Sequence, residues 1–193
     1  MMGSTAARKR RWPFWLGLAI ALSLATALLM AAGAAGLAWT NTEAFCIGCH
    51  EMKSNVYAEY QGTIHDKNRT GVRAICSDCH VPREPVPMLK RKVAATFELY
   101  GHFVSGVIDT REKFEKHRHD MATRVWTRMK QTDSLECRNC HKADSMNSEL
   151  QSAKAQARHA KGRAEGLTCI DCHYAIAHKE PEGPGPRELT LTP

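Results

Sequence analysis

The sequence has no cysteine to spare. Its eight cysteines all fall in four copies of the pattern Cys-x-x-Cys-His, so none remains for a disulfide framework or an isolated catalytic thiol. Continuous apolar runs are also few after residue 39, which argues against a conventional hydrophobic core. No recognisable nucleic-acid-binding motif is present, and because the basic residues are scattered, the formal net charge of +7 says little about the partner.

The four repeated pentapeptides are what the sequence does contain. They are Cys46–His50, Cys76–His80, Cys137–His141 and Cys169–His173. Two thiols three positions apart can form thioethers to the two vinyl groups of one porphyrin, and the adjacent histidine then lies under the iron as an axial ligand. Zinc sites and redox thiols also use Cys-x-x-Cys pairs, but neither explains a histidine after every second cysteine. The pattern therefore predicts a tetrahaem c-type cytochrome.

The predicted cofactors are four covalently bound haem c groups. Their attachment residues are Cys46, Cys49, Cys76, Cys79, Cys137, Cys140, Cys169 and Cys172. The motif ligands are His50, His80, His141 and His173, with Met52 as an alternative to His50 because thioether sulfur also binds haem iron. Six histidines outside the motifs are available for the second axial positions. We predict His65, His117, His159 and His178 as distal ligands, and His102 and His119 as surface residues.

The motif spacing indicates an internal duplication. The first two motifs start 30 residues apart and the last two start 32 apart, and His65 and His159 precede the second and fourth motifs at similar distances. We predict a mainly α fold with little regular structure. It should comprise one N-terminal transmembrane helix and a haem-cored domain at 40–179, made of two tandem dihaem modules at about 40–110 and 111–179. Residues 180–193, rich in Pro, Gly and charge, are expected to form a flexible tail.

An almost wholly apolar segment from Trp12 to Trp39 carries no charged residue and is long enough to span a bilayer. Residues 1–11 before it end in four basic residues, whereas Lys53 is the only Lys or Arg within twenty residues after it. The positive-inside rule therefore predicts a cytoplasmic N-terminus and an exported haem domain. A cleaved signal peptide is the alternative, although its apolar core should be shorter.

A regular helix is predicted between the two halves. Leu89, Val93, Phe97, Tyr100, Val104 and Ile108 recur at helical spacing. The basic residues Lys90, Arg91 and Lys92 crowd its first turn. Such a helix fits two positions, one along lipid headgroups and one packed on haem edges, and the sequence leaves both open.

Several long strings together resemble the NapC/NirT family of membrane-anchored tetrahaem quinol dehydrogenases, most of all the donors to periplasmic nitrate reductase. The strings are Asn41–Met52, Ser77–Pro82, Gly106–Thr110, Lys113–Arg118, Glu136–His141, Cys169–His173 and Ile176–Lys179. The resemblance implies a bacterial inner-membrane protein with a quinol site beside the first haem. It also implies that Met52 competes with His50 for that iron, and that a basic residue near Lys90–Lys92 contributes to the quinol site.

The expected activity is quinol oxidation followed by electron transfer, with no separate substrate chemistry. We predict Lys90, Lys92 and Glu98 as the quinol site, with Glu98 or Asp109 removing protons. The implied partners are the membrane quinol pool and a periplasmic reductase docked on a later haem, foremost nitrate reductase with its small cytochrome subunit. Donation to a nitrite, N-oxide or hydroxylamine-pathway enzyme is one alternative, and a terminal multihaem reductase is another. Association into homo-oligomers is compatible with one anchor per small domain.

Overall fold

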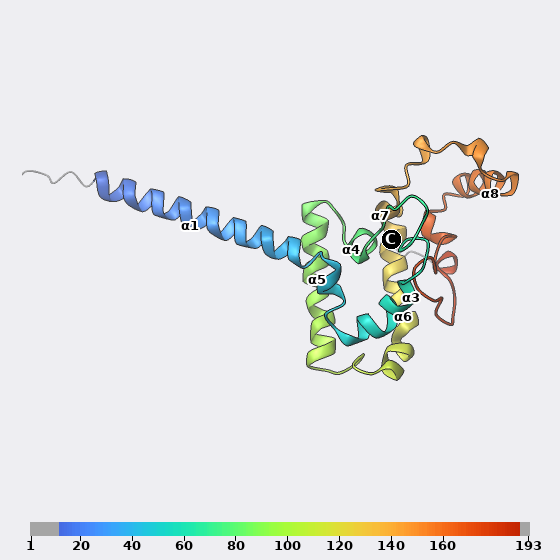
Figure 1. Cartoon of the computed structure of the whole chain (residues 1–193), viewed down its shortest axis with the longest axis horizontal. Helices are drawn as coiled ribbons and strands as arrows, with labels where there is room; N and C mark the ends of the chain where they lie inside the picture. The colour runs from blue at the N-terminus through green and yellow to red at the C-terminus, as the bar shows by residue number, and fades with distance from the viewer. Residues whose placement is uncertain (1–11, 190–193) are drawn as a thin grey trace, which may run out of the picture. The chain divides into compact units, whose positions relative to one another are not determined.

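The computed structural model describes residues 12–189, in which every regular element is helical and no strand is present (Figure 1). The basic residues 1–11 and the last residues, 190–193, lie outside the described range. The α-helices are α1 (Trp12–Trp39), α2 (Glu43–Cys46), α3 (Ala58–Tyr60), α4 (Cys76–His80), α5 (Pro85–Phe103), α6 (Arg111–Gln131), α7 (Leu135–Arg138) and α8 (Ala153–Ala164). A π-helix, η1 (Met52–Tyr57), and the 3-10 turns η2 (Ala143–Ser145), η3 (Ser148–Leu150), η4 (Cys169–Asp171) and η5 (Pro186–Glu188) complete the set. The mainly α prediction is confirmed.

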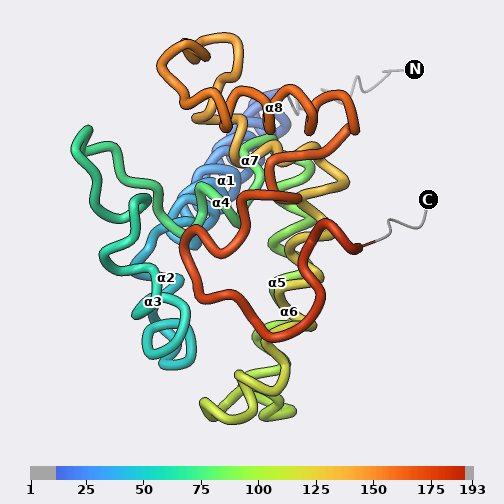
Figure 2. Tube along the Cα trace, turned by 90° about the vertical axis from the view of Figure 1, so that its right-hand side faces the viewer, coloured from blue at the N-terminus to red at the C-terminus, as the bar shows by residue number. Residues whose placement is uncertain are grey.

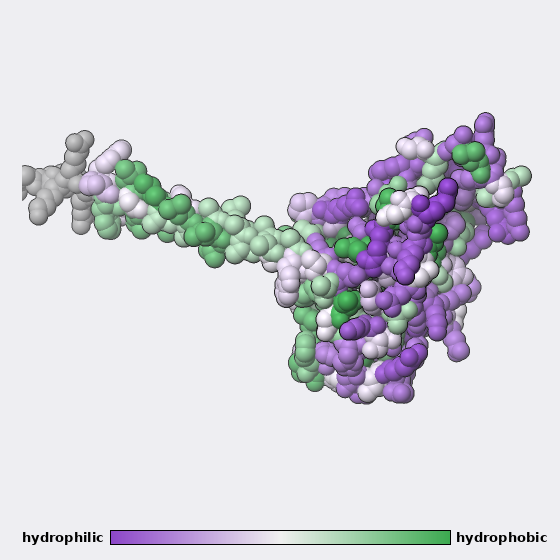
Figure 3. Space-filling view, viewed as in Figure 1, coloured by the Kyte–Doolittle hydropathy of each residue, from purple (hydrophilic) through white to green (hydrophobic). Residues whose placement is uncertain are grey.

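The chain divides into two compact units, residues 1–40 and 41–193. The first is the 28-residue helix α1, which is long and apolar enough to cross a membrane (Figure 3). Its bounds match the predicted anchor. The second unit is a single one by this division, so its separation into modules near residue 110 stays a prediction.

Two long helices frame the second unit. A proline at the start of α5 suits the first turn, where backbone N–H groups lack helical partners. The helix α6 starts at the N-cap Thr110, whose side chain accepts a hydrogen bond from the Lys113 N–H at 3.3 Å. The loop at 104–110 reverses the chain direction, so α5 and α6 run antiparallel (Figure 2).

Apolar side chains fill little of the interior. The buried hydrophobic residues among those described are Tyr60, Phe114, Trp126, Met129 and Ile170. Three of them, Trp126, Met129 and Ile170, form one cluster between α6 and the fourth motif. A polypeptide of this length normally buries far more apolar surface to offset the conformational entropy lost on folding. This arrangement fits the predicted haem-cored domain.

The C-terminal segment from residue 180 is predicted to be a flexible tail. Its described residues, up to 189, lie along α6 (Figure 2), and their flexibility stays a prediction. The Lys130 ammonium donates to the carbonyl oxygens of Pro186 at 2.8 Å and Leu189 at 3.1 Å, and Pro186 is fully buried. Proline-rich backbone is already extended, so docking it costs less conformational entropy than docking an ordinary loop.

Candidate haem-binding site

The four motifs lie on short helices that contact one another in chain order. The first motif, on α2, packs against α4, and the second motif, on α4, packs against α7. A hydrogen bond between the Cys46 and Cys76 thiols lowers the pKa of Cys46 to about 7. Burial raises the pKa of Cys79 to about 11, and the nearby Cys137 adds to this rise. Burial likewise raises the pKa of Cys137, with Cys169 of the fourth motif adding to it. The motifs therefore form a row from first to fourth.

A buried serine ties the third motif to the fourth. Ser134, which precedes α7, has no exposed surface, and its hydroxyl oxygen accepts a hydrogen bond from the Ile170 N–H at 3.1 Å. The backbone of Ser134 is left-handed, with φ at 52°, a conformation that non-glycine residues adopt only where surrounding contacts hold it. Nearby, the buried Asp171 carboxylate pairs with the Lys130 ammonium at 2.8 Å. These contacts fix the fourth motif on α6.

Each motif histidine faces one histidine from outside the motifs. The ring centres are 5.8 Å apart in the His50–His102 pair, 6.2 Å in His65–His141, 6.1 Å in His80–His178 and 6.0 Å in His159–His173. Two metal–imidazole bonds of roughly 2 Å, plus about 1 Å from each ligating nitrogen to its ring centre, place two axial rings about 6 Å apart. All four separations fit one iron between each pair.

Three of the four histidines that face a motif histidine are oriented by a contact at their Nδ1 atom. The Nδ1–H of His178 donates to the Val56 carbonyl at 3.1 Å, and that of His159 donates to the Gln151 side-chain oxygen at 2.9 Å. The His102 Nδ1 contacts a carboxylate oxygen of Glu51, which is 3% exposed. A histidine whose Nδ1 donates in this way offers its Nε2 lone pair to a metal, as in other metal sites.

Two further observations fit metal ligands. Burial lowers the pKa of His80 and of His178, so both rings are neutral at neutral pH, the form of imidazole that binds metals. The buried Nδ1 of His65 has no hydrogen-bond partner among residues 12–189, although the Tyr60 hydroxyl donates to the His65 carbonyl at 3.1 Å. With the paired thiols of each motif, these residues fit four covalently attached haems.

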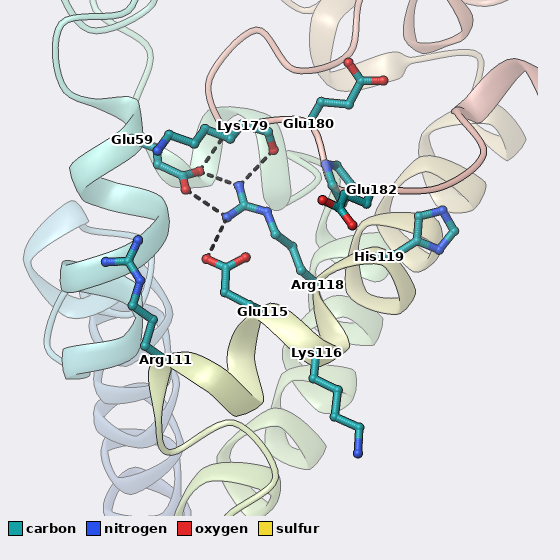
Figure 4. Close-up of a pocket in the computed structure, with 10 residues that line it drawn as sticks. Glu59, Arg111, Glu115, Lys116, Arg118, His119, Lys179, Glu180 and Glu182 are labelled. Carbon is teal, nitrogen blue, oxygen red and sulfur yellow. Dashed lines mark hydrogen bonds and ion pairs between the residues drawn. The ribbon is translucent and has the colours of Figure 1, made fainter.

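A buried arginine clamp holds the segment that carries His178 (Figure 4). Arg118 of α6 donates to both carboxylate oxygens of Glu59, at 2.8 Å to Oε1, and to the Lys179 carbonyl at 2.8 Å. The Lys179 N–H donates in turn to Glu59 at 2.9 Å. Burial alone would raise the pKa of Glu59, but these hydrogen bonds outweigh it and keep the pKa below its usual value. The clamp, Arg118, Glu59 and Lys179, lines a cavity of about 510 Å³.

The remaining predicted residues lie as follows. His117 is half-exposed and faces Asp120 at 4.0 Å, with no histidine ring beside it in the described part of the chain. Met52 starts the π-helix η1 and is exposed, while the motif histidine before it is the one that faces His102. The structure thus brings His65, His159 and His178 to motif histidines, and adds His102 rather than His117.

The predicted quinol residues sit along α5. Lys90 is exposed and Lys92 is half-buried, and desolvation lowers the pKa of Lys92. Glu98 pairs with Arg91 at 3.0 Å, and Asp109 pairs with Lys113 at 2.7 Å. Each proposed proton acceptor therefore has a basic side chain beside its carboxylate. The hydrogen bond from Lys113 lowers the pKa of Asp109. Glu98 on α5 and Asp109 in the loop after α5 therefore each lie in an ion pair with a basic residue.

Variants of His102 and His117 test which of these two histidines is an axial ligand. We expect His102→Ala to turn one haem from low-spin to high-spin, because the ring opposite His50 is removed. His117→Ala should leave the spectrum unchanged, because within residues 12–189 this ring faces Asp120 and no motif histidine. Electron paramagnetic resonance of the oxidised full-length protein measures both. A high-spin signal in the His117 variant alone would support the choice made from the sequence.

Four Cys-x-x-Cys-His motifs, each with a facing histidine, define a c-type cytochrome. The chain belongs to the NapC/NirT cytochrome c family, whose N-terminal-region model matches residues 8–183. It is 57% identical over 144 residues to the denitrification system component NirT of Stutzerimonas stutzeri, covering 75% of this chain and 71% of that one. It is 46% identical over 182 residues to the cytochrome c-type protein NapC of Escherichia coli K12, covering 90% of each.

The similarity also reaches a longer protein. The chain is 49% identical over 143 residues to the cytochrome c-type protein TorY of Escherichia coli O157:H7, which covers 74% of this chain and 39% of TorY. No solved structure matches. Family membership makes the chain an electron-transport protein with covalently bound haem c.

Proposed function

We propose that this protein oxidises quinol at the outer face of the bacterial inner membrane and passes electrons to a periplasmic reductase, foremost nitrate reductase. The observation that carries the proposal is the set of four histidine pairs. Each motif histidine already faces a second ring at 5.8–6.2 Å, which favours electron relay over substrate binding at an open iron. A terminal multihaem reductase would need one such position left open.

The chain would hold four haem c groups through its eight motif cysteines and the four histidine pairs. A bis-histidine haem supplies one-electron transfer with little change in iron geometry. The polypeptide's contribution is to fix each ligand ring. Glu51, Gln151 and Val56 orient three of the four partner histidines, and the arginine clamp holds the segment that bears His178.

The face of α5 supports a membrane-side entry for quinol. Val93, Phe97 and Phe103 are 63%, 73% and 73% exposed, an unusual density of large apolar side chains on a surface helix (Figure 3). Lys90 and Lys92 lie on the same helix. Apolar side chains beside basic ones suit the boundary between acyl chains and headgroups, where a lipid-soluble quinol is found. This pattern is compatible with the lipid-facing position of α5, on which the proposed entry site rests.

Two residues are proposed to act directly on quinol. A half-buried ammonium such as Lys92, whose pKa desolvation lowers, can donate a hydrogen bond to a quinol oxygen and exchange its proton. Glu98 is paired with Arg91 and lies outside on the same helix, so it can pass protons to solvent. Asp109 is the weaker proton acceptor because Lys113 lowers its pKa.

Replacing Lys92 tests this entry site. We expect Lys92→Gln to lower kcat/KM for quinol about tenfold or more, the loss of one hydrogen bond from a charged donor. Lys67→Gln removes an exposed lysine elsewhere and serves as the matched control. Reduction by dithionite, which does not need a quinol site, should be unchanged in both. An equal loss with dithionite would place the defect in the haems and not in quinol binding.

The proposed function is tested with the full chain in a membrane. Added quinol should reduce the haems, and purified periplasmic nitrate reductase with nitrate should reoxidise them. Haems that stay oxidised after quinol addition would reject the donor. Reoxidation by a nitrite or N-oxide reductase, but not by nitrate reductase, would keep quinol oxidation and change the acceptor. High-spin haem that binds added nitrite would favour the terminal reductase.

A further inference from the structure

The surface helix α8 carries four basic side chains, and most of them form no ion pair within the described part of the protein. Lys154, Arg158, Lys161 and Arg163 are all exposed, and α8 contains no carboxylate. Glu165, just after the helix, pairs with Lys161 at 3.6 Å and with Arg187 at 3.1 Å. Within residues 12–189, Lys154, Arg158 and Arg163 have no acidic partner. Lys154, Arg158 and Lys161 recur at helical spacing on one side of α8, and we call these three residues the α8 basic face; Arg163 lies on the other side.

Two of the four basic residues oppose the stability of the helix. Lys161 and Arg163 lie in the last turn, where cations complement the helix dipole. Lys154 lies in the first turn, where a cation is unfavourable, and it stands four positions before Arg158, so like charges share one side of the helix. The helix dipole and the side-chain pairs along the helix therefore give no reason for a basic residue at either position.

The α8 basic face adjoins the end of the motif row. His159 lies on α8, and its ring centre is 6.0 Å from that of His173 in the fourth motif. A partner seated on α8 would therefore lie beside the fourth site.

The composition of α8 indicates the kind of partner. Its only apolar residues are alanines, and Figure 3 shows hydrophilic residues over this helix. A helix that binds lipid needs large apolar side chains opposite its basic ones, as α5 has and α8 lacks. An acidic protein surface needs only opposite charge, which steers encounters and fixes orientation. The charge of α8 and its position beside the fourth motif together favour a protein.

We infer that the α8 basic face is the docking surface for an acidic patch on the soluble redox protein that accepts electrons from this chain. The inference rests on the proposed electron-transfer function and adds where, and by what chemistry, the acceptor binds. One electron leaves the protein for each one-electron oxidant reduced, so the exchange balances without a further reactant.

The test compares two charge reversals of equal size in the full-length holoprotein in nanodiscs. Lys154→Glu with Arg158→Glu alters the α8 basic face, and an acidic residue in the first turn favours the helix, so folding is preserved. Lys67→Glu with Arg69→Glu makes the same change in net charge on an exposed loop. Unchanged low-spin spectra establish that His159 keeps its place in both.

Reduced protein is mixed with ferricyanide, an anionic oxidant, and separately with a cationic cobalt(III) tris-phenanthroline complex. The α8 reversal should slow reoxidation by ferricyanide about tenfold at low salt and speed reoxidation by the cobalt complex. Added salt should reduce both effects. The loop reversal should change either rate less than about twofold. Equal effects of the two reversals would overturn the inference, because net charge alone would explain them.

A footprint on Lys154 gives a readout independent of electron transfer. Periplasmic nitrate reductase, used as the probe, should protect Lys154 from amine acetylation in neutral phosphatidylcholine nanodiscs. Protection by phosphatidylglycerol nanodiscs without any protein would overturn the inference in favour of lipid. If quinol fails to reduce the haems while the ferricyanide result holds, the proposed donor is wrong and the docking surface stands. If quinol reduces the haems and the α8 charge reversal has no effect, the quinol donor is supported and the docking surface is wrong.

Discussion

Replacing His178 with glycine is expected to turn one of the four haems high-spin and to slow electron delivery to the acceptor by on the order of 100-fold. The ring of His178 is the one that faces His80, and burial keeps both rings neutral. Without it the second iron has an open side, and that site stands between the first motif and the third in the row. Electron paramagnetic resonance and stopped-flow reoxidation after quinol reduction measure the two effects.

Exogenous imidazole supplies the control for this variant. Glycine leaves space for a free imidazole, so millimolar imidazole should restore the low-spin spectrum and part of the rate. Rescue shows that the missing ring, and not a misfolded domain, causes the defect. If the His178→Gly protein remains fully low-spin without imidazole, His80 has another partner and the pairing proposed for the second motif is incorrect.

Removing the buried arginine should have the second large effect. Arg118 and Glu59 are 11% and 10% exposed, so Arg118→Met removes the cation that pairs with a largely buried carboxylate. Breaking such a pair from one side typically costs about 3–5 kcal/mol of stability. We expect a lower urea midpoint and, because the clamp holds Lys179, a partly high-spin second haem. Arg124→Met, an exposed cation on the same helix, should change neither quantity.

A second replacement isolates the charge effect. Glu59→Gln removes the stranded charge, so the double variant with Arg118→Met should be more stable than Arg118→Met alone. Its second haem should nonetheless stay partly high-spin, because the hydrogen bond from Arg118 to the Lys179 carbonyl is still missing. A double variant no more stable than the single one would show that packing of the arginine stem, and not its charge, dominates.

The sequence predicted local features well because they depend on neighbouring residues. The predicted span from Trp12 to Trp39 matches α1 in both bounds. An uninterrupted apolar run of this length is predicted to form a single membrane-spanning helix. The helix between the halves was also predicted, because its apolar side chains recur at helical spacing, but α5 ends at Phe103, so Val104 and Ile108 of the predicted stripe lie beyond it. Each haem-attachment motif could be identified from the sequence because its two thiols and its histidine lie within five consecutive residues.

Partner histidines could not be assigned in this way, because pairing depends on how distant segments meet. The prediction of His117 rested on its position after a motif, and His102 was predicted to be a surface residue. In the structure α6 turns His117 toward Asp120, while the end of α5 brings His102 to Glu51. The duplication did not carry over to pairing either. His159 faces the motif of its own half, whereas its counterpart His65 faces His141 of the other half.

The arginine clamp left no trace in the sequence. Arg118 lies four residues after the buried Phe114, on the inward side of α6, where an apolar residue is the usual expectation. Its carboxylate partner, Glu59, is 59 residues away in the chain, and nothing local links the two. Only the fold shows that a cation belongs there.

The pairing of His80 with His178 also bears on how the molecule is made. Ribosomes produce chains from the N-terminal end, and 98 residues (178 − 80) separate the two rings. The second motif thus emerges early but is completed only after the segment that carries His178 has been made. A nonsense codon just after the fourth motif would yield a product with all four attachment sequences intact and an unfinished site in its middle.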